Sequence, residues 1–341
     1  MPVSAAADVD VLVVGAGHGG LTVAARLRQA RRDVLLVDGS SRVGDSWRNR
    51  YDSLRLFTPR PLNGLPASVF PPGDDSFPLK DEVADYHEEY VGAMSLPLRL
   101  GCRVTALRHA GPVFEAVAGS LLVKARAVVV ATGVFGAGRI PSFAAQLDPS
   151  VLQLHSSMYR RPSDLPDGPV VVVGARNSGA DIAVEVARKR PTTIAMGTPI
   201  PRAPARWRNP FWWRIPPWRE RLIGDLALPL PWPFRPGGFV TADVDHAVAA
   251  HALRRAGRAV GAQGDEIRFA DGASVRARTV IWASGYNPDY SWIDAPRLDG
   301  KIAIGDHGRS AVQRLWIVRG RFLFSIRRHA DDVARDVIAA R

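Results

Sequence analysis

Two glycine-rich turns in the sequence have the spacing that accommodates a phosphate group. In the first turn, Gly15, Gly17 and Gly20 follow the pattern Gly-x-Gly-x-x-Gly, with His18 between them. Such a turn at a helix start offers backbone N–H groups and the positive end of the helix dipole to a pyrophosphate, and glycine lets the backbone come close. Asp38 follows eighteen residues after Gly20, where a dinucleotide site needs a carboxylate for the adenosine ribose. The pattern predicts a dinucleotide site.

A second turn of nearly the same pattern begins at Gly174, directly after the apolar run 170–173. It has Arg176 at the position of Gly17, so a side chain stands where the first turn has none. This arginine either obstructs a pyrophosphate or pairs with its oxygens, as a guanidinium does well. The residues predicted to bind the second dinucleotide are Gly174, Arg176, Asn177, Ser178 and Gly179.

Each turn is followed by a similar closing segment. Residues 125–133 (ARAVVVATG) are echoed by 277–285 (ARTVIWASG), and the first and closing glycines lie 118 and 111 residues apart in the two units. Two units of similar size that both open on a nucleotide turn predict two dinucleotide-binding halves. The closing residues expected near the cofactors are Ala131, Thr132, Gly133, Ser284 and Gly285.

The predicted fold is α/β, with two nested Rossmann-like domains that each have a central parallel sheet and a small β-meander. We place the first part of one domain at 1–165, the inserted domain at 166–280 and the completing part at 281–341. Apolar runs and amphipathic stretches predict the elements that position the turns. Predicted strands are 9–14, 33–37, 127–131, 170–173 and 192–196, with a meander around 104, 114 and 122; predicted helices are 21–30, 79–91, 180–190 and 330–340.

The composition excludes several kinds of chemistry. The chain has 341 residues, 46% of them hydrophobic, which is ordinary for a globular protein of two domains. Cys102 is the single cysteine, so the sequence offers no Cys-x-x-Cys redox pair and no thiolate cluster, and we expect no metal site. The sequence has no apolar run of bilayer length and no secretory signal pattern at its start, so we expect a cytoplasmic protein.

A longer pattern between the turns indicates a family. Residues 43–60 (VGDSWRNRYDSLRLFTPR), followed by Leu65-Pro66, resemble the flavin-loop signature of the flavin-containing monooxygenases, most closely their bacterial members and the plant auxin-forming branch. The resemblance covers nearly the whole chain and continues through 77–80, 131–133, 154–160, 174–179 and 283–286. It implies FAD at the first turn, NADPH at the second, and a flavin hydroperoxide that transfers oxygen from molecular oxygen to a small organic substrate. Tyr159, where Baeyer-Villiger relatives place tryptophan, favours N- or S-oxygenation or oxidative decarboxylation.

The resemblance also implies roles for single residues. Gly15, Gly17 and Gly20 would hold the FAD pyrophosphate, Asp38 would bind the adenosine ribose, and Val104 would lie near the adenine. Arg202 is placed to meet the extra ribose phosphate of NADPH, although an ordinary surface arginine is an equal alternative. The residues implied on the flavin side are Ser46, Trp47 and Arg48, and His18 is included in the FAD turn.

The segment 199–236 combines aromatic and basic residues. It holds five of the nine tryptophans, in a chain whose basic residues exceed its acidic residues by 12. Such a mixture suits a membrane-surface patch or a nucleic-acid stacking platform. Because relatives carry an aromatic segment at this point, we favour a cleft wall or lid, keep weak contact with a membrane surface open, and expect no nucleic-acid partner.

We predict an FAD-dependent, NADPH-using monooxygenase, and departures from the family pattern keep alternatives open. Phe57 stands where relatives often carry Asn or His, which removes a polar donor near the flavin. The tail 312–328 is shorter and more basic than the family's loop before the last helix. These departures favour the alternative of an NAD(P)H reductase or oxidase without oxygen insertion, and a non-catalytic membrane-surface protein is a second alternative. His155 is more consistent with a structural histidine than with a base, and no residue grouping requires a catalytic acid or base.

Overall fold

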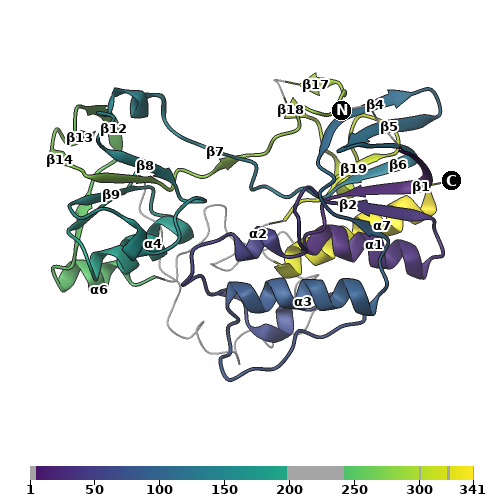
Figure 1. Cartoon of the computed structure of the whole chain (residues 1–341), viewed down its shortest axis with the longest axis horizontal. Coiled ribbons are helices and arrows are strands. Elements are labelled where there is room, and N and C mark those ends of the chain that lie inside the picture. Colours follow the sequence, from purple (N-terminus) through teal and green to yellow (C-terminus); the bar gives the residue numbers. More distant parts are fainter. Residues whose placement is uncertain (1–4, 198–241, 299–300, 321–322, 341) are drawn as a thin grey trace, which may run out of the picture. The chain divides into compact units, whose positions relative to one another are not determined.

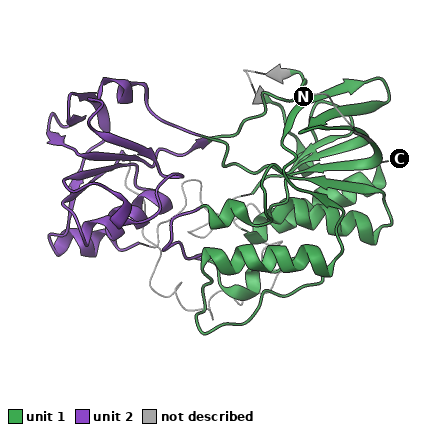
Figure 2. Ribbon diagram, viewed as in Figure 1, with its two compact units in different colours: residues 1–49, 58–137, 287–341 green, residues 50–57, 138–286 purple. Residues whose placement is uncertain are grey.

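The computed structural model describes residues 5–197, 242–298, 301–320 and 323–340. The chain divides into two compact units (Figure 2). Unit 1 comprises residues 1–49, 58–137 and 287–341, and unit 2 comprises residues 50–57 and 138–286. The chain therefore passes between the units four times, and a short segment of eight residues, 50–57, belongs to unit 2 although unit 1 residues flank it on both sides.

Unit 1 is built on one sheet in the order β3-β2-β1-β6-β5-β4, with β19 paired to β6. β1 is parallel to β2 and β6, whereas β4, β5 and β6 form an antiparallel meander. β6 belongs to both the antiparallel and the parallel part of the sheet. Its first half pairs with β5 in the meander, and its end, Val128–Val130, pairs in parallel with β19. The strands are β1 Ala5–Val14, β2 Val34–Val37, β3 Leu98–Arg99, β4 Val104–Ala110, β5 Val113–Ala118, β6 Leu121–Val130 and β19 Leu315–Ile317.

Helices cover one face of this sheet, with α1 and α7 packed against each other and α3 beside α1 (Figure 1). Leu12 and Val14 of β1 pack into the apolar cluster on the meander side, while Val11 and Val13, which point the other way, are also fully buried. Burial on both faces explains the continuous apolar run 11–14 at the end of β1. The helices and remaining short strands are α1 His18–Gln29, α2 Asp45–Arg48, η1 Arg60–Asn63, α3 Lys80–Ala93, η6 Asp306–Gly308, α7 Leu323–Ala339, β17 Arg297–Leu298 and β18 Lys301–Ile302.

Unit 2 contains a parallel sheet in the order β11-β10-β9-β15-β8. One face of β9 packs with α4 and α6, and the other packs with the antiparallel meander β12-β13-β14. The strands are β8 Leu152–His155, β9 Val170–Val173, β10 Thr192–Ala195, β11 Leu253–Ala256, β12 Ala259–Gln263, β13 Glu266–Phe269, β14 Ser274–Arg276 and β15 Thr279–Trp282, with α4 Asn177–Ala187, α6 Val244–Ala249, η2 Ser142–Gln146 and η3 Pro162–Asp164; the two-stranded ribbon consists of β7 Ala137–Gly138 and β16 Tyr286–Asn287.

The predicted α/β class, with a parallel sheet and a meander in each half, is confirmed. The two helices that follow the glycine turns begin three residues earlier than predicted, because the last residues of each turn already form the first helical turn. The domain boundaries at 165 and 280 stay a prediction. The compact units change at 137 and 286 instead, because β8 pairs with β15 and so lies in unit 2.

Candidate functional site

The first turn joins β1 to α1 at the carboxyl end of the sheet. Gly15 has a φ of +105°, and a Cβ atom there would lie 2.6 Å from the carbonyl oxygen of Ala131. A Cβ atom on Gly20 would overlap the carbonyl oxygen of Gly15, whereas one on Gly17, the N-cap of α1, would have no neighbour within 4 Å. The protein's own packing therefore requires glycine at the first and last positions. At the middle position it leaves a space that its own atoms do not fill.

The second turn has the same construction in unit 2. Gly174 has a φ of +109°, and a Cβ atom there would overlap the carbonyl oxygen of Ala283, while one on Gly179 would overlap that of Gly174. The N-cap of α4 is Arg176, whose φ and ψ of −75° and −179° match the −78° and −177° of Gly17. Its side chain is exposed. The repeat predicted from the sequence thus has the same backbone geometry in both turns and differs in the side chain at the middle position.

The strand next to the first turn is β2 and the strand next to the second turn is β10, and the residue that follows each strand differs. β1 pairs with β2 in a register that sets Val14 opposite Val37, so Asp38 follows beside the first turn. Asp38 accepts the backbone N–H of Ala16 at 2.6 Å through Oδ2 and that of Ser40 at 2.7 Å through Oδ1. In unit 2 the register sets Val173 opposite Ala195, and Met196 follows. The first turn therefore has a carboxylate beside it, and the second has a thioether.

A small hollow opens at the first turn. Its lining joins the turn, the end of β2 and the loop before α2, three parts of the chain that the sequence analysis had assigned to one cofactor. Of the residues expected on the flavin side, Ser46 reaches this hollow, and Trp47 lies partly buried next to it in the chain. The lining residues are Ala16, Gly17, Asp38, Ser40, Arg42, Val43, Gly44, Asp45 and Ser46.

His18, the first residue of α1, is paired with a second buried histidine that the sequence analysis missed. Its Nδ1 lies 3.1 Å from Nε2 of His87 on α3, and the two side chains are 4% and 0% exposed. Burial, which disfavours the charged form, lowers the pKa of His18 well below its ordinary value and that of His87 to about 3. Both imidazoles are therefore neutral at neutral pH.

The residue after the N-cap carries an unsatisfied polar atom in both turns. Nε2 of His18 and Oδ1 of Asn177 are buried and have no hydrogen-bond partner within the described structure. Buried polar atoms almost always have a partner, which for such an atom is a water molecule or a bound group. Arg32, His87 and Thr279 also have such an atom, so the feature marks the two turns without being confined to them.

Arg48 points towards α3. Its guanidinium donates to the carbonyl oxygen of Val43 and pairs with Asp85 at 2.7 Å and Glu88 at 3.0 Å. The two acidic residues lie three positions apart on α3, so they face the same side of the helix. Arg48 thus fastens the loop around α2 to α3, a contact between residues 37 and 40 positions apart that no local pattern indicates.

The closing residues of the two units lie at the carboxyl ends of their strands. Ala131 is buried directly after β6, while Thr132 and Gly133 are exposed. In unit 2, the backbone N–H of Arg139 donates to the carbonyl oxygen of Gly285 at 2.9 Å, and its side chain donates to that of Ser284. Val104, expected near the adenine, is 8% exposed and belongs to the apolar cluster of the meander.

His155 has the environment of a structural histidine. Its Nε2 lies 3.0 Å from the carbonyl oxygen of Gly285, which can only accept, so Nε2 carries the proton. Its Nδ1 then accepts from the backbone N–H of Ser157 at 3.2 Å. Burial lowers the pKa of His155, and the hydrogen bond to Gly285 opposes this effect without reversing it. Both nitrogens are therefore engaged, which agrees with the expectation that this residue is not a base.

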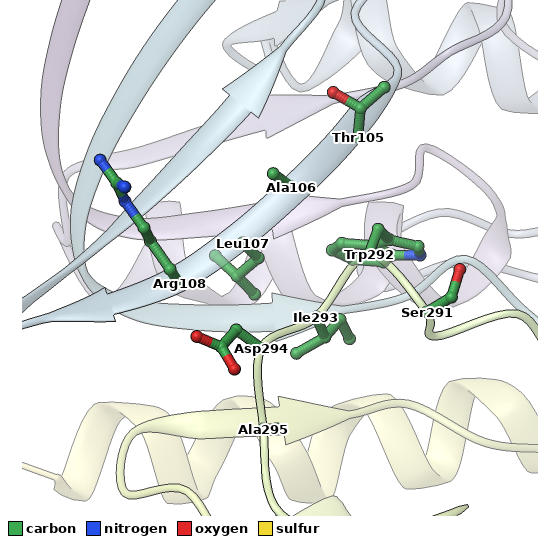
Figure 3. A pocket seen from close by; sticks show the side chains of 9 residues that line it. All are labelled: Thr105, Ala106, Leu107, Arg108, Ser291, Trp292, Ile293, Asp294 and Ala295. Carbon is green, nitrogen blue, oxygen red and sulfur yellow. The ribbon is translucent and has the colours of Figure 1, made fainter. Parts of the chain in front are cut away.

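Arg202 and the segment 199–236 lie outside the described residues. A larger open hollow lies between β4 and residues 291–295, where Leu107 forms a bridge with Ile293 (Figure 3), and none of the predicted site residues line it. Across the described ranges no cluster of three or more His, Cys, Asp or Glu residues could hold a metal ion, and no helix there has both the length and the apolar character to cross a bilayer.

Comparisons with known proteins place this geometry in a family. The model of the pyridine nucleotide-disulphide oxidoreductase family matches residues 12–222, which include both turns. An uncharacterized CzcO-like oxidoreductase of Geobacillus kaustophilus is 37% identical over 300 residues, which cover 85% of this chain and 84% of the relative. Indole-3-pyruvate monooxygenase YUCCA1 of Oryza sativa is 30% identical over 198 residues, or 55% of this chain and 48% of the relative.

The same assignment comes from solved structures. A double mutant of a flavin monooxygenase from Stenotrophomonas maltophilia superimposes with a TM-score of 0.82 at 25% identity and covers 98% of this chain and 99% of that one. The chain belongs to the pyridine nucleotide-disulphide oxidoreductase family. The resemblance to the flavin-containing monooxygenases is confirmed, and the protein is an oxidoreductase of the flavin monooxygenase type.

Proposed function

We propose that the protein is an FAD-dependent, NADPH-using monooxygenase that oxygenates a small organic molecule. The observation that carries this proposal is the pair of glycine turns, which share one backbone geometry and each carry a buried polar atom without a partner. Two dinucleotides in one chain allow a nicotinamide and a flavin to react, since electron transfer between them needs contact that the protein must preorganise. When bound, FAD would supply the redox chemistry, that is, two-electron transfer from a nicotinamide and reaction with molecular oxygen.

The first turn fits FAD. The space at Gly17 admits the pyrophosphate, and the N–H groups at the start of α1 face it with the positive end of the helix dipole. Both oxygens of Asp38 have one backbone donor each, and the remaining lone pairs can accept the adenosine ribose hydroxyls. A carboxylate at this point repels a phosphorylated ribose, so the first turn suits FAD and disfavours NADPH.

The second turn fits NADPH. Met196 stands where the first turn has Asp38, so no carboxylate opposes a ribose 2′-phosphate. Arg176 is the N-cap of α4, and a guanidinium at this position can pair with the oxygens of a pyrophosphate. In this proposal Gly174, Arg176 and Gly179 frame the pyrophosphate, and Asn177 and Ser178 contribute polar groups at the helix start.

The remaining predicted residues keep supporting roles in this proposal. Ser46 and Trp47 lie at or beside the hollow and contact FAD, whereas Arg48 acts by holding their loop against α3. The closing segments 131–133 and 283–285 border the two turns, because Gly15 and Gly174 pack against the carbonyls of Ala131 and Ala283. Because Cys102 is the only cysteine, the chain has no disulfide of its own to receive electrons; oxygen, a substrate or another protein could accept them, and this proposal takes oxygen.

The test separates oxygen insertion from simple oxidation. The protein is reconstituted with FAD, reduced anaerobically with NADPH, and then mixed with oxygen in the presence of panels of amines, thioethers and 2-oxo acids. A monooxygenase releases less hydrogen peroxide than the NADPH it consumes with at least one substrate, and isotopically labelled oxygen enters that product. Peroxide equal to NADPH with every compound would contradict oxygen insertion and favour the oxidase that Phe57 suggests. Failure to bind FAD at all would overturn both.

A further inference from the structure

The segment 50–57, which we name the strap, holds half of the flavin-loop signature and is bound by unit 2. It is the only part of unit 2 that lies before residue 138, and the residues on either side of it, 49 and 58, belong to unit 1. The sequence signature runs without a break from 43 to 60, so its pattern does not show that the strap is bound elsewhere. Contacts of Tyr51, Asp52 and Arg50 hold the strap in unit 2.

Tyr51 anchors the strap to α4. Its side chain is 4% exposed and packs in the apolar cluster that includes Ile182 and Ala183 of that helix. Its hydroxyl donates to Oδ2 of Asp181 at 2.9 Å. Burial, reinforced by the nearby Glu185, raises the pKa of Asp181 to about 6, and burial also raises the pKa of Tyr51. A hydrogen bond in such a sheltered position is stronger than one in water.

The backbone of the strap is held at two further points. The N–H of Asp52 donates to the carbonyl oxygen of Arg160 at 2.9 Å, and the guanidinium of Arg160 donates back to the carbonyl oxygen of Arg50 at 2.9 Å. Arg50 also donates to the hydroxyl of Tyr286 at 3.2 Å, with its guanidinium 5.8 Å from the centre of that ring. These contacts fix both the course of the strap and the side chain at its start.

All of these partners lie beside the second glycine turn in the topology of unit 2. Asp181 is two residues beyond Gly179 on α4, Arg160 follows β8, and Tyr286 follows β15. The carboxyl ends of parallel strands form the edge where α/β sheets bind ligands, and the strand order reverses between β9 and β15. The strap is therefore bound to the elements that a dinucleotide at the second turn would contact.

We propose that Tyr51 and Asp181 are positioning residues that link the second dinucleotide site to the flavin loop. A dinucleotide at the start of α4 restricts the motion of the first turns of that helix, including Asp181. Because Tyr51 is hydrogen-bonded to Asp181, the motion of the strap is restricted as well. The strap is itself part of the flavin signature, which continues from Phe57 into residues 58–60 of unit 1. This inference rests on the proposed function, because it assigns the two ends of the link to NADPH and FAD. Coupling of this kind is reciprocal, so each cofactor must strengthen the binding of the other.

A matched pair of variants tests the link. Tyr51→Phe removes the hydroxyl bonded to Asp181, and Tyr159→Phe removes the hydroxyl bonded to Glu185 at 2.8 Å, one helical turn further along the same helix. Both tyrosines belong to one apolar cluster, and both variants keep the ring, but Tyr51 alone is in the strap. Any general loss of packing or of a buried hydrogen bond on α4 therefore affects both variants alike.

The first readout uses NADP⁺ alone, without FAD. Amide hydrogen exchange is followed at Asp52 and Leu54, whose N–H groups are bonded to Arg160 and Tyr51 carbonyls. We expect NADP⁺ to slow exchange in the strap of the native protein and of Tyr159→Phe, and to leave it unchanged in Tyr51→Phe. Binding of NADP⁺ without protection of the strap in the native protein overturns the link and leaves the proposed function intact.

The second readout measures the coupling itself. The dissociation constant of FAD is determined with and without saturating NADP⁺, and that of NADP⁺ with and without FAD. We expect a coupling factor of about 5 to 100 in the native protein and in Tyr159→Phe, and a factor near 1 in Tyr51→Phe. Independent binding in the native protein, or an equal loss of coupling in both variants, would overturn the link. The proposed function fails instead if NADPH does not reduce bound FAD.

Discussion

The two glycine turns share a backbone geometry but differ in the side chains around it. Gly15 and Gly20 correspond to Gly174 and Gly179, and in each pair the glycine is required because a Cβ atom would collide with a backbone carbonyl. The middle position, the next residue and the neighbouring strand end all differ: glycine, histidine and aspartate in unit 1 become Arg176, Asn177 and Met196 in unit 2. The comparison separates the glycines that the fold needs from the positions where the two turns differ in chemistry, to which the proposed function assigns the choice of ligand.

The largest expected effect comes from adding a methyl group where the fold requires glycine. Gly20→Ala and Gly179→Ala each push a Cβ atom into the carbonyl of the first glycine of the same turn. We expect each variant to lose about 3 kcal/mol or more of stability. Thermal unfolding followed by circular dichroism measures the loss. Gly17→Ala is the control, with a change of about 1 kcal/mol or less, as for other substitutions at an N-cap.

Leucine at the middle position of each turn tests the open space at the first turn and the positive charge at the second turn separately. Gly17→Leu fills the space that the protein leaves open, and we expect FAD affinity to fall about 100-fold, or about 2.7 kcal/mol. Arg176→Leu keeps the bulk and removes the charge, and we expect NADP⁺ affinity to fall about tenfold. Fluorescence titrations measure both. Native FAD affinity in Gly17→Leu would show that the space at this turn does not receive the pyrophosphate.

The pH dependence of stability is expected to have opposite signs at the two turns. The folded-state pKa of His87, about 3, lies below its ordinary value of 6.5, so the unfolded state binds more protons and stability is lost as the pH falls below 6.5. At pH 5 this loss is about 2 kcal/mol, since one pKa unit corresponds to about 1.4 kcal/mol. The pKa of Asp181, about 6, lies above its ordinary 3.8, so unit 2 gains stability from this group as the pH falls from 6 to 3.8.

Two substitutions check these signs by chemical denaturation at pH 7.5 and pH 5. His87→Gln is expected to reduce the loss of stability on acidification, and His109→Gln, which changes an exposed histidine of the same unit, leaves it as it is. Asp181→Asn can still accept from Tyr51 and is expected to remove the gain in unit 2. An identical pH dependence in the native protein and His87→Gln would mean that the buried histidine pair is not the source.

The smallest expected effect concerns the choice of nicotinamide cofactor. Met196→Asp places a carboxylate beside the second turn, as Asp38 is placed beside the first. We expect the ratio of kcat/KM for NADPH over NADH to fall about tenfold, because the carboxylate repels the 2′-phosphate and can bind an unmodified ribose. Met196→Leu is the control and keeps the native ratio. An unchanged ratio in Met196→Asp would mean that the ribose does not lie beside this residue.

Much of the fold follows from local rules in the sequence. The apolar runs of β1 and β9 and the glycine patterns after them indicate strand, turn and helix without further information, and the turns have the predicted form. The helices after the turns begin earlier than predicted, because Gly19 and Gly20 are poor helix formers by themselves and become helical through packing; a Cβ atom on Gly19 would press against Val318 and Ile326. Propensity alone does not locate such a helix start.

The sequence by itself determined the two glycine turns, the glycines that each turn needs, and Asp38 after its strand, because these depend on residues within about 25 positions of one another; the repeat of whole units was indicated by the similar closing segments more than 100 residues further on. The tertiary structure alone decided that His18 pairs with His87, that Arg48 is bound by α3, and that Tyr51 is held by Asp181, 130 residues away. Strand register likewise identified Met196 as the counterpart of Asp38. The physical reason is that a turn is specified by local backbone sterics, whereas the partner of a buried polar side chain is set by which elements pack against it.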